Sequence, residues 1–265
     1  MRAILSVATL LLTSTAVYAN GLSPFQCATD TVADYQTNYG TGSDACSNGI
    51  LNFSFFSFEI YQSSGGTALT ASQIDLSPLS PGQGQTGATG FSVTGLDDSP
   101  ISAAPGQSVT YVIDWLYNID SGPVTSGASL GMDPPSGDIT ITQYYCLDSN
   151  FENGQSYEGV APTCTTSLEG TRPGVQALTV STTDPNDLCD DSGDYCASTT
   201  FNPPAQAYAE VMTVIQLTGG DDGATFDSVN GSAQIDPPAP EPATFLLIPA
   251  GMLLLICIRR RPIKL

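Results

Sequence analysis

Five aspartates crowd one loop of the chain at a density that could hold a metal ion. Carboxylate oxygens are hard ligands, so a loop with this many of them suits calcium. The loop lacks the alternating register, central glycine and terminal glutamate of an EF-hand. A solvated acidic loop is therefore the alternative interpretation, and the second acidic cluster (Asp221, Asp222 and Asp227) leaves the same choice open. The candidate calcium ligands are Asp184, Asp187, Asp190, Asp191 and Asp194.

Six cysteines outside the terminal segments predict disulfides rather than zinc. The chain has no CxxC pair and no histidine, whereas structural zinc sites use such ligands. An even cysteine count in an oxidising compartment indicates disulfides. Pairing is not fixed by sequence, but the separations favour nearest neighbours: Cys27 with Cys46, Cys146 with Cys164, and Cys189 with Cys196.

Most catalytic mechanisms are excluded by composition. Without histidine there is no Ser-His-Asp or Cys-His arrangement, and without lysine outside the C-terminal segment Ser-Lys and Schiff-base mechanisms are excluded too. Gly219–Gly223 lacks the lysine of a P-loop and is better explained as a strand connection. A carboxylate pair, as in glycoside hydrolysis, stays open, with Asp114 and Glu210 as candidates. Solvent-facing carboxylates are the commoner explanation, so we expect no enzyme.

The charge is strongly one-sided. Between the terminal segments Arg172 is the one basic residue against all 26 acidic residues. Such a surface repels nucleic acid and anionic membranes. It suits a soluble surface protein, or one that captures calcium and bridges acidic loops to an anionic exopolysaccharide.

Aromatic rings in or near loops could stack on sugars. The same rings could instead pack on disulfides or line a sheet. Ice binding would require repeated Thr-x-Thr, and Thr140-Ile141-Thr142 occurs as a single instance. The candidate sugar-binding rings are those of Tyr144, Tyr145, Tyr157 and Tyr195.

Alternating apolar residues predict strands that would position these groups. Val109–Tyr117 alternates like a half-buried antiparallel strand with Trp115 in the core, and a phase break at Phe55-Phe56 predicts a bulge. Loops are predicted at Ser77–Gly90, Asp120–Gly137 and Thr183–Pro204. We expect an all-β fold, an antiparallel β-sandwich that is immunoglobulin-like or jelly-roll-like. The other predicted strands are Leu51–Tyr61, Gly90–Leu96, Asp138–Cys146, Val175–Ser181, Tyr208–Leu217 and Thr225–Ile235.

The N-terminus has the pattern of a secretory signal. Arg2 precedes the apolar stretch Ala3–Val17, and the small residue Ala19 predicts cleavage before Asn20. The signal peptide is thus residues 1–19, which implies the secretion translocon and signal peptidase as partners. An uncleaved anchor is the alternative. The acidic ectodomain is expected at residues 20–235.

The C-terminus has three consecutive parts. A Pro-rich stalk (236–242) contains Pro240-Glu241-Pro242, an apolar run (243–258) follows, and a basic tail (259–265) begins with Arg259-Arg260-Arg261. The run would be about 24 Å long as a helix, against roughly 30 Å of bilayer hydrocarbon. We expect a single transmembrane helix, and the basic tail is predicted to stay in the cytoplasm.

This tail resembles the PEP-CTERM sorting signal of bacterial exported proteins. Pro240, Glu241, Pro242 and the cluster Arg259, Arg260 and Arg261 carry the resemblance, together with the apolar run between them. Segments of this kind are sometimes labelled an ice-binding protein C-terminal domain, a label that describes the tail only. The resemblance implies processing by a membrane protease, exosortase, after transient anchoring in the inner membrane. It also implies a final place at the cell surface or in an extracellular polysaccharide matrix.

The resulting expectation is an exported protein with a structural or adhesive role in an exopolysaccharide or biofilm. The alternative is a non-catalytic carbohydrate-binding module, with calcium as a conceivable aid to binding. An ordinary membrane anchor is the alternative to the sorting signal.

Overall fold

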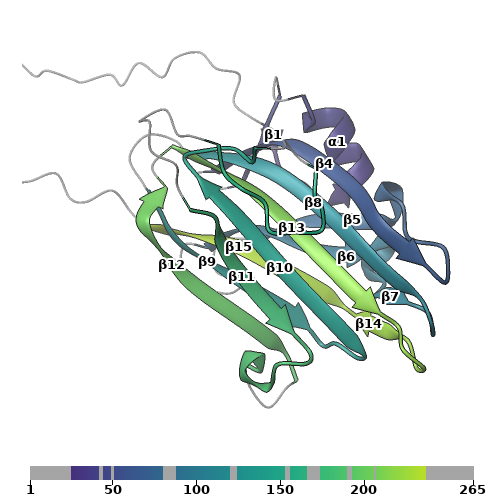
Figure 1. The fold of residues 1–265 in the computed structure, drawn as a ribbon. Coiled ribbons are helices and arrows are strands. Elements are labelled where there is room, and N and C mark those ends of the chain that lie inside the picture. The colour runs from purple at the N-terminus through teal and green to yellow at the C-terminus, as the bar shows by residue number, and fades with distance from the viewer. Residues whose placement is uncertain are drawn as a thin grey trace, which may run out of the picture.

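The protein folds into two β-sheets that pack face to face, as Figure 1 shows. The computed structural model describes residues 25–41, 44–48, 51–79, 88–119, 124–152, 156–165, 174–189, 193–205 and 207–236. The predicted signal peptide, apolar run and basic tail, and the stalk beyond Asp236, lie outside these residues. Within the described part there is no helix long and apolar enough to cross a membrane.

The first sheet has seven strands, and its pairings are antiparallel except for β1 with β3. In spatial order they are β1 (Phe25–Gln26), β3 (Cys46–Asn48), β4 (Leu51–Ser64), β8 (Ser108–Ile119), β13 (Tyr208–Thr218), β10 (Asp138–Leu147) and β11 (Gln176–Ser181).

The second sheet has six antiparallel strands, and a two-stranded sheet lies at one end of the sandwich. The six are β12 (Tyr195–Ala205), β9 (Val124–Asp133), β15 (Ser228–Asp236), β6 (Ala88–Gly95), β5 (Ile74–Leu79) and β2 (Asp30–Thr31), and the small sheet pairs β14 (Ala224–Phe226) with β7 (Ile101–Ala103).

The core lies between the sheets and is rich in aromatic rings. Trp115 is 3% exposed, as predicted, and its ring lies 5.8 Å from that of Phe91 and 6.5 Å from that of Phe56. Aromatic pairs at such distances add to the free energy gained from burial of their surface. The predicted bulge is also confirmed, because the register of β4 against β8 shifts at Phe55, which has a φ of 57°.

A short helix that the sequence pattern did not predict closes one side of the sandwich. Helix α1 (Val32–Tyr39) begins at Thr31, whose hydroxyl accepts a hydrogen bond from the Asp34 backbone N–H. Tyr35 of α1 is buried and packs against Phe56, with the two ring centroids 4.7 Å apart. The three short 3-10 helices are η1 (Ala71–Gln73), η2 (Leu96–Asp98) and η3 (Pro185–Asp187).

Two predicted loops contain strands. β9 lies within Asp120–Gly137, and most of β12 lies within Thr183–Pro204. β9 is built from Gly, Ser, Ala and Thr with few large apolar residues, so its alternation is weak. β12 lies at the edge of its sheet, where the two prolines of its sequence are tolerated. In both places pairing with neighbouring strands decides the structure.

The sheets approach closely at Gly231, where a larger residue would collide with the first sheet. A Cβ on Gly231 would lie 2.5 Å from the Gln143 side-chain amide nitrogen. That nitrogen donates to the Thr213 hydroxyl at 2.9 Å, so the amide is not free to move away.

We predict that Gly231→Ala lowers the free energy of unfolding by about 1–3 kcal/mol, the usual cost of overpacking a core. Gly131→Ala is the matched control, because the nearest atom to its Cβ would lie 3.8 Å away. Urea denaturation of both variants is the measurement. Equal stability of the two would contradict this account of the contact between the sheets.

Candidate binding face on the seven-stranded sheet

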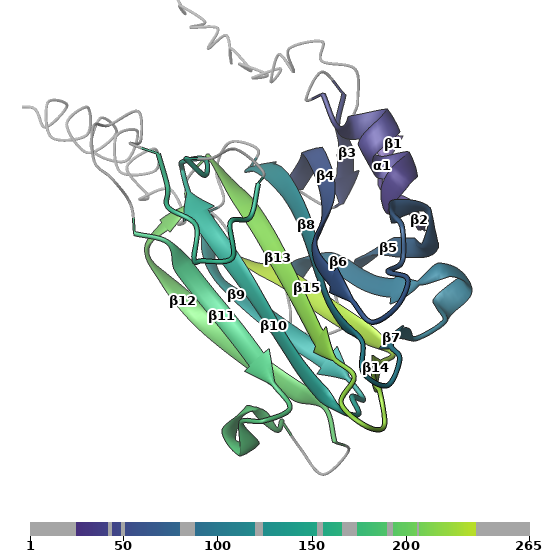
Figure 2. The same ribbon diagram turned by 45° about the vertical axis from the view of Figure 1, so that its right-hand side comes forward.

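The outer face of the seven-stranded sheet is half covered by a loop, which we call the flap. The flap comprises residues 148–152 and 156–165, and the Cys146–Cys164 disulfide ties it to β10. Figure 2 shows it crossing in front of β10 and β13. Its side chains Phe151 and Tyr157 pack with Val112, Met212 and Val214 of the sheet in a second apolar cluster.

Burial of the outer face corrects one expectation. The alternation predicts a half-buried strand at Val109–Tyr117, yet β8 is buried on both faces, Thr110 and Asp114 included. The reason is tertiary: β8 is an inner strand of its sheet, and the flap lies over its outer side. Alternation reports the polarity of side chains along one strand. It does not predict burial by a loop that is distant in the sequence.

The flap covers the two carboxyl groups that the sequence singled out. Asp114 pairs in register with Met212, and Glu210 pairs with Leu116, so the two acids are diagonal neighbours on adjacent strands. Asp114 has no exposed surface, and neither of its carboxyl oxygens has a hydrogen-bond partner. Glu210 is 5% exposed and accepts a hydrogen bond from the Phe151 backbone N–H of the flap.

No cation balances this pair, because the described residues include no lysine, arginine or histidine. Burial, and secondly the charge of Glu210, hold the pKa of Asp114 well above its ordinary value. Burial also raises the pKa of Glu210, while the hydrogen bond from Phe151 acts in the opposite direction. Burial thus favours the protonated form of these carboxyl groups, and Asp114 has no exposed surface for a substrate to reach.

The flap borders β4 through a contact between two tyrosines. Tyr61 is bulged out of register on β4, and its ring lies edge-on to Tyr157 at 5.0 Å. The Tyr157 backbone N–H donates to the Glu59 carboxylate at 3.4 Å. Tyr61 remains 40% exposed, so one aromatic ring stands in solvent at the border of the flap.

Beyond the flap the outer face carries a row of uncharged polar side chains. They come from five adjacent strands and are aligned by strand register. Beside the row lie Thr142 and Thr179, whose hydroxyl oxygens are 3.1 Å apart. We call the row and this pair the polar platform. The row is Gln62, Thr110, Gln216, Thr140 and Ser181. Gln62 and Gln216 are exposed and Thr140 is half-buried, whereas Thr110 and Ser181 are buried.

The predicted sugar-stacking tyrosines do not converge on one exposed surface. Tyr145 is wrong as a candidate, because it points into the core and donates to the Gln143 side-chain oxygen. Tyr157 belongs to the flap and is buried against the sheet, Tyr144 is half-buried beside it, and Tyr195 lies half-buried on β12. Tyr61, which was not singled out, is the more exposed ring on this face.

Two of the candidate calcium ligands, Asp190 and Asp191, lie outside the described residues. The other three have hydrogen-bond partners within the protein. Asp184 accepts from the Asn186 backbone N–H at 2.9 Å, and Asp187 accepts from the Ser181 N–H at 2.8 Å. Asp194 accepts through its backbone oxygen from the Cys189 N–H at 2.9 Å. Among the described residues no group of three or more His, Cys, Asp and Glu is arranged to hold a metal ion.

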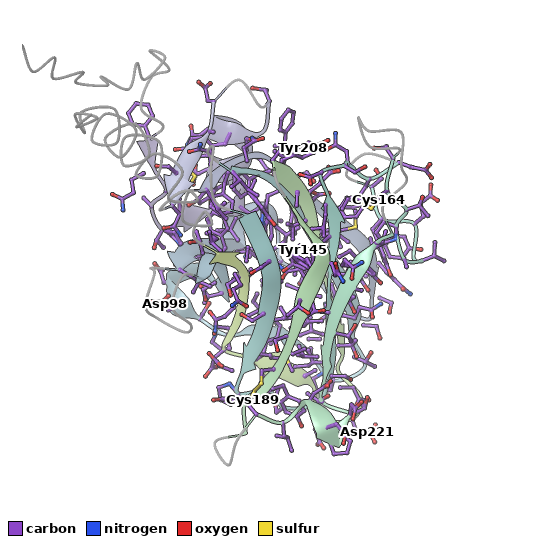
Figure 3. All side chains as sticks on the ribbon, turned by 90° about the vertical axis from the view of Figure 1, so that its left-hand side faces the viewer. Asp98, Tyr145, Cys164, Cys189, Tyr208 and Asp221 are labelled. Atoms are coloured by element: carbon purple, nitrogen blue, oxygen red, sulfur yellow. A yellow bond between two sulfur atoms is a disulfide. The ribbon has the colours of Figure 1, made fainter. Side chains whose placement is uncertain are left out.

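The three predicted disulfides, Cys27–Cys46, Cys146–Cys164 and Cys189–Cys196, are confirmed. Figure 3 places Cys189 and Asp221 at the end of the sandwich opposite Cys164 and Tyr208. The acidic loops are therefore remote from the flap.

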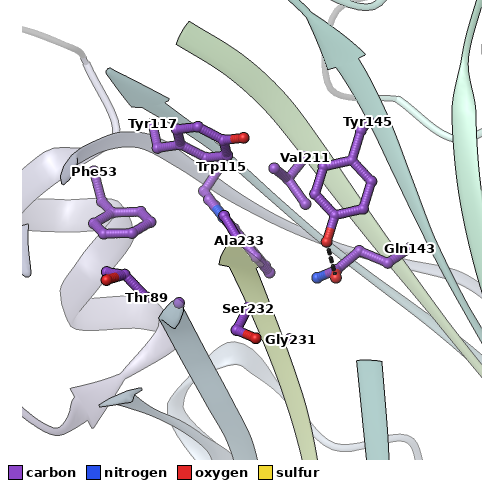
Figure 4. A pocket seen from close by; sticks show the side chains of 11 residues that line it. Phe53, Thr89, Trp115, Tyr117, Gln143, Tyr145, Val211, Gly231, Ser232 and Ala233 are labelled. Atoms are coloured by element: carbon purple, nitrogen blue, oxygen red, sulfur yellow. Dashed lines mark hydrogen bonds between the residues drawn. The ribbon is translucent and has the colours of Figure 1, made fainter. Parts of the chain in front are cut away.

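A small cavity between the sheets is a second place to consider. Trp115, Tyr117, Tyr145 and Ser232 line it, as Figure 4 shows, and all are buried. Its size is about that of one water molecule. It is too small for a sugar ring, so the outer face is the better candidate.

No protein-family model and no curated protein matches the chain. Among solved structures, the carbohydrate-binding module TmCBM61 in complex with β-1,4-galactotriose gives a TM-score of 0.34 at 7% identity, covering 69% of this chain and 88% of that chain. A family 11 carbohydrate-binding module from Clostridium thermocellum, in complex with a β-1,3-1,4-mixed-linked tetrasaccharide, gives 0.26 at 9% identity, covering 68% and 88%. Both TM-scores are too low to transfer a function.

We predict that Asp114→Asn changes how stability depends on pH. Since burial raises the folded-state pKa, the stability from this group is complete below the unfolded-state pKa of about 3.9 and is lost as pH rises through the folded-state value. The amide cannot ionise, so the variant should be more stable than the wild type by about 1–3 kcal/mol at alkaline pH and equal to it in acid.

Denaturation curves from about pH 4 to pH 9 test this prediction. Asp221→Asn, at an exposed turn, is the control for the loss of a carboxylate. A profile for Asp114→Asn that runs parallel to the wild type would contradict protonation of the buried pair.

We also predict that replacing Cys146 and Cys164 by serine loosens the flap. The disulfide joins residues 18 positions apart, and loops of this length give about 3 kcal/mol. Amide hydrogen exchange at Phe151 and Tyr157 should accelerate. The double serine variant of Cys189 and Cys196, at the far end, should leave those two amides unchanged; acceleration in both variants would show global loosening instead.

Proposed function

We propose that this chain is an exported bacterial protein that acts at the cell surface or in an extracellular polysaccharide matrix. In this account it has a structural or adhesive role and is not an enzyme. The single observation that carries the proposal is the set of three disulfides in one domain. Disulfides of this kind persist in oxidising compartments outside the cytoplasm.

A non-catalytic role is supported by the state of the acid pair. Glycoside hydrolysis needs two carboxyl groups on either side of a bond in an accessible cleft. Asp114 is instead sealed under the flap, beside apolar side chains such as Met212 and Val214. The exposed part of the same face offers hydroxyl and amide groups, which bind without supplying a nucleophile or base.

Sorting is proposed to follow the PEP-CTERM pattern. The signal peptide would direct the chain to the translocon, the apolar run would hold it in the inner membrane, and exosortase would process it near Pro240-Glu241-Pro242. Arg259, Arg260 and Arg261 would stay on the cytoplasmic side.

A carbohydrate-binding module is the second candidate function. The polar platform favours it, because an uncharged hydrogen-bonding surface stands out on a strongly acidic chain.

Intact mass of the protein from the envelope and the medium of its native host tests the proposal. We predict a mass that ends near Pro242, with two hydrogens gained on reduction for each of the three disulfides. Replacing Pro240, Glu241 and Pro242 by alanine should abolish processing. Alanine at Pro237 and Pro238 is the control and should not.

A mature chain in the envelope that retains Cys257 through Leu265 would contradict sorting and leave an ordinary anchor. Recovery of any of the six disulfide-forming cysteines in the reduced state, from either fraction, would contradict export.

A further inference from the structure

We infer that the polar platform binds an uncharged polysaccharide chain without the aid of calcium. The inference rests on the proposed extracellular function and names the ligand class for its binding face. It departs from the expectation that calcium bridges acidic loops to an anionic polymer.

The charge of the domain favours a neutral ligand over an anionic one. All five side chains of the row are uncharged, in a chain whose formal net charge is −20. An anionic polymer would meet the negative potential of the whole domain, and the described residues provide no lysine or arginine to pair with it. A neutral polymer avoids this repulsion.

The chemistry of the platform matches sugar hydroxyls. Serine, threonine and glutamine side chains both donate and accept hydrogen bonds, as sugar hydroxyl groups do. The row crosses five strands at about 4.8 Å per strand, so its accessible groups, those of Gln62, Gln216 and Thr140, lie along a line. Gln216 at its centre is exposed, as is Thr179 beside it.

The platform is partly preorganised on the β10–β11 side. Thr140 and Ser181 have hydroxyl oxygens 3.0 Å apart, in addition to the Thr142–Thr179 pair. Ser181 also meets the Thr183 hydroxyl at 2.8 Å. Side chains already fixed by such bonds lose less rotamer freedom on binding, which lowers the cost of capturing a weakly held ligand.

An aromatic ring stands at the β4 end of the row. Tyr61 directly precedes Gln62 in the chain, and the flap holds its ring through Tyr157. A Cβ on Gly159 would lie 2.2 Å from the Tyr61 hydroxyl oxygen, so a glycine there allows the ring to lie against the flap. The exposed side of the ring gives a sugar an apolar surface beside the hydrogen-bonding row.

Calorimetric titration of the exported, oxidised full chain tests the inference. The probes are the neutral hexasaccharides cellohexaose, laminarihexaose and xylohexaose, and the anionic hexamers of galacturonate and guluronate, each with calcium and with EDTA. We expect binding of at least one neutral probe, unchanged by EDTA. Gln216→Glu and, independently, Thr179→Glu should each raise its Kd about tenfold or more, because each places a charge on the platform.

Gln234→Glu is the matched control. Gln234 is also an exposed glutamine on an inner strand, but it lies on β15 of the other sheet, so its substitution should leave the Kd unchanged. Tyr61→Ala should weaken binding without changing the thermal midpoint of unfolding by more than a surface substitution does.

Three results would overturn the inference: binding of none of the neutral probes, calcium-dependent binding of the anionic probes alone, or equal effects of Gln216→Glu, Thr179→Glu and Gln234→Glu. Failure here is separable from failure of the proposed function. A correctly sorted, disulfide-bonded chain that binds no neutral hexasaccharide would refute the ligand and leave the export proposal intact.

Discussion

The absence of any basic side chain in the described structure constrains every carboxyl group in it. A carboxylate that folding covers finds no basic partner among the described residues, so within them it accepts hydrogen bonds, remains solvated or keeps its proton. Asp148 accepts from the backbone N–H groups of Ala207 and Tyr208, and Asp133 accepts from the side chains of Ser228 and Asn230. Asp114 differs from them, because both of its oxygens are buried without a hydrogen-bond partner.

The same constraint divides the outer face of the seven-stranded sheet into two parts. Under the flap the acids lie among apolar side chains, and burial raises the pKa of both. Beyond the flap, register aligns hydroxyl and amide groups of five strands in a row that contains no charge. The Cys146–Cys164 disulfide keeps these parts distinct, since it fixes the flap to β10. In our proposal, the uncharged side chains of this row offer a neutral polymer a place to bind, while the acidic domain as a whole repels anions.

Sequence predicted much of the fold for identifiable reasons. The strands with strong apolar alternation, the bulge at Phe55 and the neighbour pairing of cysteines are local features, so local patterns were sufficient. β9 has small residues and β12 contains prolines, and only their pairing with neighbours makes them strands. Helix α1 was missed because its apolar face is narrow, with Val32 and Tyr35 as its buried residues.

The candidate site was predicted only in part. Asp114 and Glu210 were singled out as strand carboxylates, but their neighbourhood depends on a register between β8 and β13 and on a flap far along the chain. The platform could not be recognised from one strand, because each contributes one or two of its residues. Thr140-Ile141-Thr142 contains the part of the platform that is visible in one strand. Strand pairing, which the sequence does not give, aligns Thr140 with Gln216 and Ser181.

The protonation state of Asp114 tests this account most directly. Carbon-13 NMR of the side-chain carboxyl groups reports ionisation residue by residue, and an Asp114→Asn sample assigns the signal. The account predicts that the Asp114 carbon keeps the chemical shift of a neutral carboxylic acid to a pH well above the ordinary aspartate pKa of about 3.9, because burial raises its pKa. An Asp114 signal that titrates near about 3.9 would contradict the claim that burial favours the protonated form of this group.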